Sequence, residues 1–159
     1  MATPDKIKKA VDMLRHADAK SYMRDGANEI SLKMASVELA HHGYPALPDD
    51  YTELIRHAYG IMGPYFTLLG IGGMEMAGGG HQPGIIETSE AFNRWNDDDD
   101  TKTLVIGKMS GGVVITHKDG QYHIVDETSR DVFRSYADIA DFITDTIIRL
   151  DKARQGAIG

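Results

Sequence analysis

The chain of 159 residues has the length of one ordinary domain, and its 42% hydrophobic and 26% charged residues are typical of a globular protein. It has no cysteine, which excludes a disulfide framework, a thiolate metal site and a cysteine nucleophile. Its formal net charge of −7 argues against binding to nucleic-acid phosphates or anionic lipid. One interpretation is that this charge only keeps the chain in solution, and the other is that it attracts a basic protein partner.

The first residues, Met1–Lys6, contain no apolar segment of the kind found in a signal peptide. No apolar run elsewhere approaches the roughly 20 residues that a membrane-spanning helix needs. We therefore expect a cytoplasmic protein with no membrane partner.

Three helices are predicted in the first 60 residues. Thr3-Pro4-Asp5 is typical of a helix N-terminus, and this helix is expected to fade by Asp25-Gly26. A second helix is expected over about Glu29–His41, and a third from Pro48-Asp49-Asp50 to Gly60. Ile7, Val11 and Leu14 form one apolar stripe in the first helix, and Tyr51, Leu54, Ile55 and Ala58 line one face of the third. In the second helix, most of the apolar positions are supplied by Ile30, Met34, Val37 and Leu39.

The middle of the chain predicts a strand, a glycine-rich loop and a short helix. Tyr65–Ile71 has the composition of a strand. Gly72–Gly84 is expected to be a mobile surface loop, because Gly80 runs into His81-Gln82-Pro83-Gly84 without the lysine of a phosphate-binding loop. Ser89 is expected to cap a short helix that carries Phe92 and Trp95.

Asp119-Gly120 gives the strongest hairpin signal in the chain. It joins expected strands at Val113–His117 and Tyr122–Asp126, and Leu104–Lys108 reads as a strand before them. A two-residue turn pairs Lys118 with Gln121, His117 with Tyr122, and Ile115 with Ile124. The expected core face then holds Val113, Ile115, Tyr122 and Ile124, and the other face holds Val114, Thr116, His123 and Val125.

The order of the elements predicts an α+β fold with a mostly antiparallel sheet, a C-terminal meander and flanking N-terminal and C-terminal helices. The last helix is expected to open at Ser135, with Asp138 in a capping-box position. We expect one domain over 1–159, with its N-terminal helix in 1–28 and a frayed tail at 153–159. The residues expected in the core are Leu54, Ile55, Leu68, Ile106, Ile115, Ile124, Phe142 and Ile143.

No residue pattern specifies an active site or a metal site. His41 and His42 diverge by about 100° on a helix, and the hairpin register puts His117 and His123 on opposite faces of the sheet. Ser110 lies between strands and not in a nucleophile elbow. We therefore expect no catalytic residue, no cofactor and no metal.

A contiguous acidic run comes after the expected short helix. A calcium loop alternates its ligands and includes a glycine, so this run does not predict a calcium site. One interpretation is a solvated loop. The other is a binding patch for a basic partner, with an aromatic anchor beside it and two further carboxylates on the third helix. The residues of that patch are Trp95, Asp97, Asp98, Asp99, Asp100, Asp49 and Asp50.

The third helix and several later segments resemble a known family. Leu47-Pro48-Asp49-Asp50-Tyr51, continuing to Leu54 and Tyr59-Gly60, resembles the LPxDYxxFL…NG helix of the SUKH superfamily. The resemblance covers about Ser31 to Leu150 and is greatest to the YrhA-type group. Tyr59-Gly60 in place of Asn-Gly, and the Gly72–Gly84 loop, depart from the pattern. Later segments similar to the family are Leu104–Gly107, Val113–Asp126 and Asp131–Tyr136.

The resemblance implies a mixed sheet flanked by helices and no known catalytic activity. It also implies that the chain is similar to proteins many of which neutralise toxins, often nucleases, of polymorphic-toxin systems. The expected function is thus a non-catalytic immunity protein, or antitoxin, that binds a basic toxin domain. Two alternatives stay open: a cytosolic scaffold or regulatory protein of the same fold, and a small-molecule-binding protein or enzyme that uses Gly72–Gly84 and His81.

Overall fold

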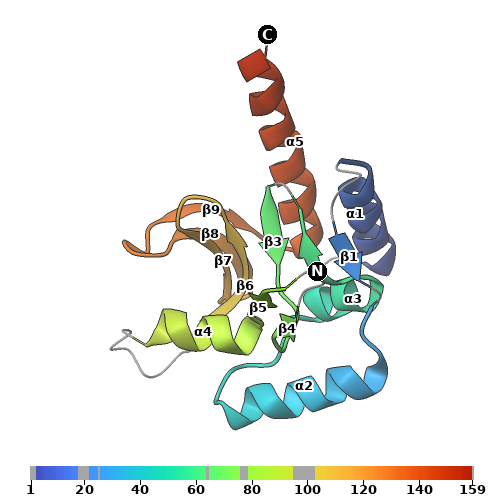
Figure 1. Cartoon of the computed structure of the whole chain (residues 1–159), viewed down its shortest axis with the longest axis vertical. Coiled ribbons are helices and arrows are strands. Elements are labelled where there is room, and N and C mark those ends of the chain that lie inside the picture. Colours follow the sequence, from blue (N-terminus) through green and yellow to red (C-terminus); the bar gives the residue numbers. More distant parts are fainter. Residues whose placement is uncertain are drawn as a thin grey trace.

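A computed structural model describes residues 3–17, 22–24, 26–63, 65–75, 79–94 and 103–158. In this part of the chain, an antiparallel sheet of seven strands in the order β1-β2-β3-β6-β7-β8-β9 is combined with five helices (Figure 1). The predicted α+β class with a C-terminal meander and flanking helices is confirmed.

The strands of the main sheet are β1 (Tyr22–Arg24), β2 (Tyr59–Met62), β3 (Phe66–Leu68), β6 (Leu104–Met109), β7 (Val113–Lys118), β8 (Gln121–Asp126) and β9 (Val132–Tyr136). A separate pair, within the segment predicted to be a loop, is formed by β4 (Met74–Glu75) and β5 (His81–Gln82). The helices are α1 (Pro4–Ala17), α2 (Glu29–His41), α3 (Asp49–His57), α4 (Ile85–Asn93) and α5 (Ile139–Ile158).

The hairpin of β7 and β8 has the predicted register. Lys118 pairs with Gln121 and Ile115 with Ile124. Asp119 and Gly120 have φ values of 54° and 77°, which is the left-handed pair of a tight hairpin turn. The predicted core face is confirmed by the burial of Ile115, Tyr122 and Ile124. The opposite face holds a smaller apolar cluster of Val105, Val114 and Val125, against which Phe92 of α4 packs.

The main core lies where α1, α3 and α5 meet the sheet. Helix α1 packs against both α3 and α5, while α4 packs against β6 (Figure 1). This core runs from Ile7 to Ile147 in sequence and includes the predicted stripes of the first and third helices. All eight residues predicted to be buried are at most 5% exposed: Leu54, Ile55, Leu68, Ile106, Ile115, Ile124, Phe142 and Ile143.

Several predicted boundaries are wrong. The first helix ends at Ala17, and β1 occupies part of the segment assigned to it. Gly60 does not end α3 but lies inside β2 with φ 74°. Ser89 does not cap α4, which begins after Gly84; it is fully buried, and its hydroxyl accepts a hydrogen bond from the Val105 amide at 2.8 Å.

The C-terminal prediction also needs correction. Ser135 belongs to β9, so the last helix begins at Ile139, with Asp138 accepting a hydrogen bond from the Asp141 amide at 2.7 Å. The helix continues past Lys152 to Ile158, where the sequence predicted a frayed tail. In Figure 1 its last turns extend beyond the sheet.

Candidate functional site

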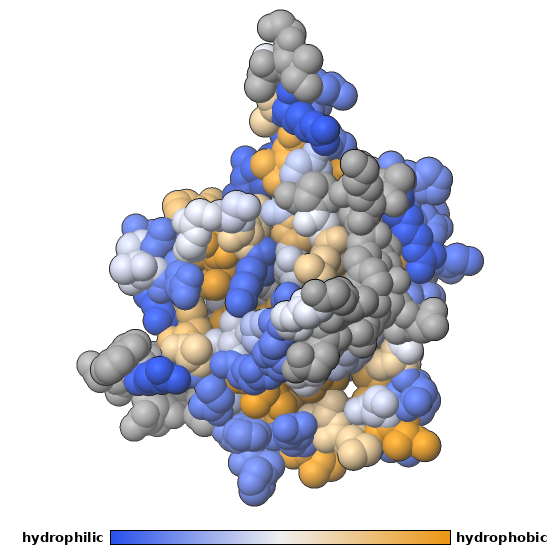
Figure 2. Space-filling view, viewed as in Figure 1, coloured by the Kyte–Doolittle hydropathy of each residue, from blue (hydrophilic) through white to orange (hydrophobic). Residues whose placement is uncertain are grey.

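Helix α2 has apolar side chains on two opposite faces. Its buried side chains, which join the main core, are Leu32, Ala35 and Leu39. Three apolar side chains on the other face are 69–72% exposed: Ile30, Met34 and Val37. We call these three the outer stripe. At 100° per residue they lie half a turn away from the buried set. Figure 2 shows apolar colour along the lower edge, where Figure 1 places α2.

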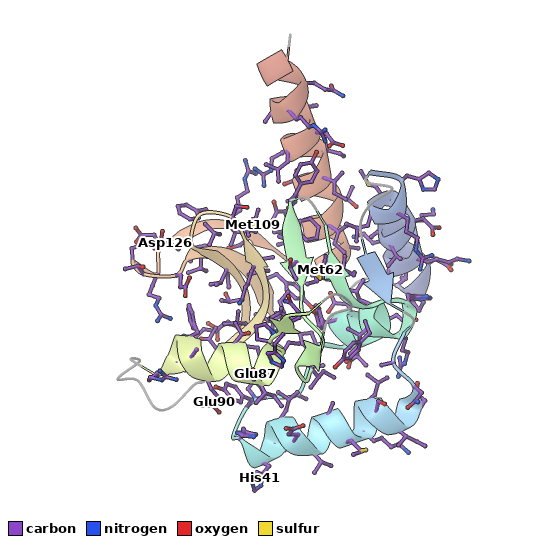
Figure 3. All side chains as sticks on the ribbon, in the orientation of Figure 1. His41, Met62, Glu87, Glu90, Met109 and Asp126 are labelled. Carbon is purple, nitrogen blue, oxygen red and sulfur yellow. The ribbon has the colours of Figure 1, made fainter. Side chains whose placement is uncertain are left out.

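The helix is held in place by contacts at its two ends. At the start, the Asn28 side chain accepts a hydrogen bond from the Ser31 amide at 2.8 Å, and Glu29 forms an ion pair with Arg56 of α3 at 2.9 Å. Just before it, a Cβ on Gly26 would lie 1.7 Å from the Arg56 carbonyl oxygen. At the other end, Nδ1 of His42 lies 3.4 Å from Glu90 of α4, a residue labelled in Figure 3. The outer stripe is thus presented on a positioned helix.

A groove of about 400 Å³ lies between α2 and the rest of the protein. Met34 belongs both to the outer stripe and to the lining of this groove, so the two features are continuous. Glu38 is the charged residue of the lining, which also includes Ala27, Ser31, Tyr59 and Ile71. The groove therefore combines apolar surface with one carboxylate.

The structure separates the two aspartates that were predicted to extend an acidic patch. Asp49 is exposed at the first position of α3, whereas Asp50 is only 5% exposed. Its burial corrects the prediction that Asp50 contacts a partner. The remaining predicted residues, Trp95, Asp97, Asp98, Asp99 and Asp100, lie outside the described residues.

The Asp50 carboxylate is occupied by internal hydrogen bonds. One oxygen accepts from the Tyr122 hydroxyl at 2.7 Å and from the Tyr51 amide at 2.9 Å, and the other accepts from the Ile139 amide at 2.8 Å. Asp50 thereby connects α3, β8 and the start of α5. Burial raises the pKa of Tyr51 and of Tyr122, and the Asp50 charge raises that of Tyr122 further. Both phenols thus stay protonated at neutral pH and serve as hydrogen-bond donors.

The face of the sheet opposite the main core has two hollows, one on each side of Phe92. The first, of about 390 Å³, is lined among others by Lys108 together with Glu87 and Glu127. The second, of about 360 Å³, is lined by three apolar side chains and by five that carry basic or hydroxyl groups. We call the second the cationic hollow; the five are Thr103, Thr116, Lys118, His123 and Arg130.

The histidines do not gather into a site. His117 and His123 lie on opposite faces of the hairpin, as predicted. In the glycine-rich segment, His81 of β5 forms an ion pair with Glu87 of α4 at 3.2 Å, both side chains being about half exposed. Among the described residues, no group of three His, Asp or Glu side chains is placed to hold a metal ion. No helix in that part of the chain has the length and apolar character to cross a membrane.

Comparison with protein-family models, with curated proteins and with solved structures finds no significant match to this chain.

Sequence reasoning missed both the outer stripe and the cationic hollow. The sequence does indicate the outer stripe, because α2 carries two sets of apolar residues with helical spacing. One set is at positions 30, 34 and 37, and the other is at positions 32, 35 and 39. Periodicity could not tell which set faces the core. The hollow had no local signal, because its residues come from α4, the position before β6, β7, β8 and the segment around the start of β9.

Proposed function

We propose that this chain is a cytosolic, non-catalytic protein-binding module that acts as an immunity protein, neutralising a basic toxin domain. The observation that carries the proposal is the outer stripe of α2. Exposed large apolar side chains that line up on one face are characteristic of interaction surfaces, and spacing at i, i+4 and i+7 suits recognition through a helix face. The immunity role itself rests on the resemblance of the sequence to SUKH proteins.

The charge of the chain supports a basic partner. A net charge of −7 would steer a basic toxin domain toward the protein and raise the association rate at low salt. At the groove, Glu38 would meet a lysine or arginine beside the apolar contact. We therefore expect a partner that presents apolar side chains flanked by cations.

The hydrogen bonds that the buried carboxylates form inside the protein support a role without catalysis. Asp50 is saturated by three internal donors, and Asp138 binds Lys6 at 2.8 Å and caps α5. Burial alone would raise the pKa of Asp138, but the hydrogen bonds from Lys6 and from the Asp141 amide hold it below its ordinary value. Both carboxylates are therefore committed to joining elements of the fold.

The test is capture of partners from the native lysate by the tagged protein, with mass spectrometry after low-salt and moderate-salt washes. We expect a stoichiometric basic protein that moderate salt releases. Ile30→Ser with Met34→Ser should lose it, because the apolar contact is removed. Phe133→Ser is the matched control. Phe133 is 58% exposed on β9, and it belongs neither to the outer stripe nor to the groove beside α2.

The second half of the test separates an immunity protein from a scaffold. The captured protein is expressed alone and together with this chain. Growth arrest that the wild type relieves and the α2 double variant does not would support neutralisation of a toxin. A partner that is harmless when expressed alone would favour the scaffold, and retention of the partner by the double variant would remove α2 from the proposal.

A further inference from the structure

The cationic hollow differs in charge from the rest of the molecule. Among the described residues its lining contains the basic side chains Lys118, Arg130 and His123 and no carboxylate, in a chain whose net charge is −7. Among the described residues, neither Lys118 nor Arg130 has a carboxylate within ion-pair distance. Lys6 and Arg56, by contrast, each meet two carboxylates. Within the part of the chain that the structure describes, two cations without a carboxylate partner thus face the same small cavity.

Arg130 is held in position before any ligand arrives. Its guanidinium lies 3.5 Å from the centre of the Phe92 ring and donates a hydrogen bond to the Phe92 carbonyl at 2.8 Å. Its backbone has φ 68°, which non-glycine residues rarely adopt.

The turn that carries Arg130 is organised by Asp126, labelled at the end of β8 in Figure 3. The Asp126 carboxylate accepts from the amides of Thr128 and Ser129 at 2.9 and 2.8 Å, and these bonds lower its pKa. The Arg130 amide donates to the Asp126 carbonyl at 3.0 Å. A cation that is fixed in this way loses little conformational entropy when an anion binds.

The floor of the hollow offers further hydrogen-bonding groups. Thr116 and Thr103 are 2% and 7% exposed, and in the described part of the chain their hydroxyls have no hydrogen-bond partner. Nδ1 of His123 lies 2.7 Å from the Ser135 hydroxyl and Nε2 lies 3.3 Å from the Lys118 carbonyl, so the imidazole is oriented by both ring nitrogens. Apolar surface from two valines, at positions 125 and 132, completes the lining.

We propose that the cationic hollow binds a small organic oxyanion, either a phosphate monoester or a carboxylate, through Arg130 and Lys118. The guanidinium offers paired donors that match the geometry of both anions, and the ammonium adds a second charge. The threonine hydroxyls supply neutral donors, and the apolar part of the ligand packs on Val125 and Val132. This binding activity is separate from the proposed immunity function, because the outer stripe of α2 contributes none of its residues.

The neighbouring hollow provides the matched control. Lys108 lines it together with the carboxylates of Glu87 and Glu127, so this hollow carries both signs of charge. Anion binding that depends on charge alone would be affected equally by Lys108→Gln and Lys118→Gln. Binding in the cationic hollow would be affected only by the second.

The test is an amide NMR titration of the full chain with phenyl phosphate, benzoate and inorganic phosphate, at constant ionic strength set with chloride. We expect saturable shifts centred on residues 116–118 and 129–131. Arg130→Gln should weaken binding about tenfold, the loss typical of one charged hydrogen bond. Lys118→Gln should weaken it several-fold, and Lys108→Gln should leave it unchanged. Tighter binding of phenyl phosphate or of benzoate identifies which oxyanion is preferred.

Two results would overturn the proposal. One is the absence of saturable shifts in the wild type with all three anions. The other is equal weakening by Lys108→Gln and Lys118→Gln, which would indicate diffuse attraction to surface cations. Because Arg130→Gln changes a residue of a tight turn, its unfolding temperature is measured alongside; Lys118→Gln, at an exposed side chain, tests the site without that complication.

Discussion

Helices α2 and α3 are neighbours in the chain and use their apolar residues in different ways. Helix α3 buries one face completely, with Tyr51, Leu54 and Ile55 at most 1% exposed. Helix α2 divides its apolar residues between two faces and leaves three of them, including Met34, largely in solvent. A helix can thus be apolar either to build the fold or to present a surface, and only packing distinguishes the two.

The largest expected effect is on the free energy of unfolding. Leu54→Ala should lower it by about 2–5 kcal/mol, because a buried side chain is lost and a cavity is left. Met34→Ala should change it by less than about 0.5 kcal/mol, because that side chain is 69% exposed. Urea unfolding followed by circular dichroism measures both. Equal losses would show that α2 belongs to the core as much as α3 does.

The two aspartates at the start of α3 allow a buried and an exposed side chain to be compared within one helix. Asp50→Asn should lower the free energy of unfolding by about 1–3 kcal/mol, because its amide group cannot accept hydrogen bonds from all three donors. Asp49→Asn should cost less than about 1 kcal/mol, since only an exposed charge near the helix N-terminus is removed. If the two variants unfolded at the same urea concentration, the internal role of Asp50 would be refuted.

The smallest expected effect is a dependence of stability on pH that comes from His117. This half-buried histidine of β7 packs its ring 4.8 Å from that of Tyr122, and burial lowers its pKa below the ordinary value. The unfolded chain therefore takes up this proton first as the pH falls below about 6.5, so stability decreases from there down to the folded-state pKa. Thermal melts between pH 8 and pH 5 should show a weaker decrease for His117→Gln than for the wild type. His16→Gln, at an exposed position, is the control and should behave like the wild type.

The sequence predicted the fold best where local signals and burial agreed. The Asp119-Gly120 turn determined the register of β7 and β8, and the alternation of side chains then identified Ile115 and Ile124 as core residues. Strands β1 and β2 were missed because three or four residues are too few to show alternation. Strand β9 was missed because its side chains are largely exposed on both faces, so Ser135 was assigned to the next helix.

The candidate surfaces were predicted less well than the fold. Asp50 lies beside Asp49 in a sequence that looks like a charged helix start, and only the packing of β8 and α5 shows that it is buried. The cationic hollow depends on the approach of Arg130 to Phe92, residues 38 positions apart that no local pattern connects. Surfaces of this kind arise from tertiary contacts, which a single sequence does not display.

The contact between Gly26 and Arg56 has a consequence for how this protein can change. No side chain fits at Gly26, because even a methyl group would overlap the carbonyl oxygen at the end of α3. Substitution of the residue that leads into α2 is therefore not tolerated, whereas the exposed positions of the same helix can be substituted. A lineage of such proteins could exchange Ile30, Met34 and Val37 to match a changing partner and keep its architecture intact.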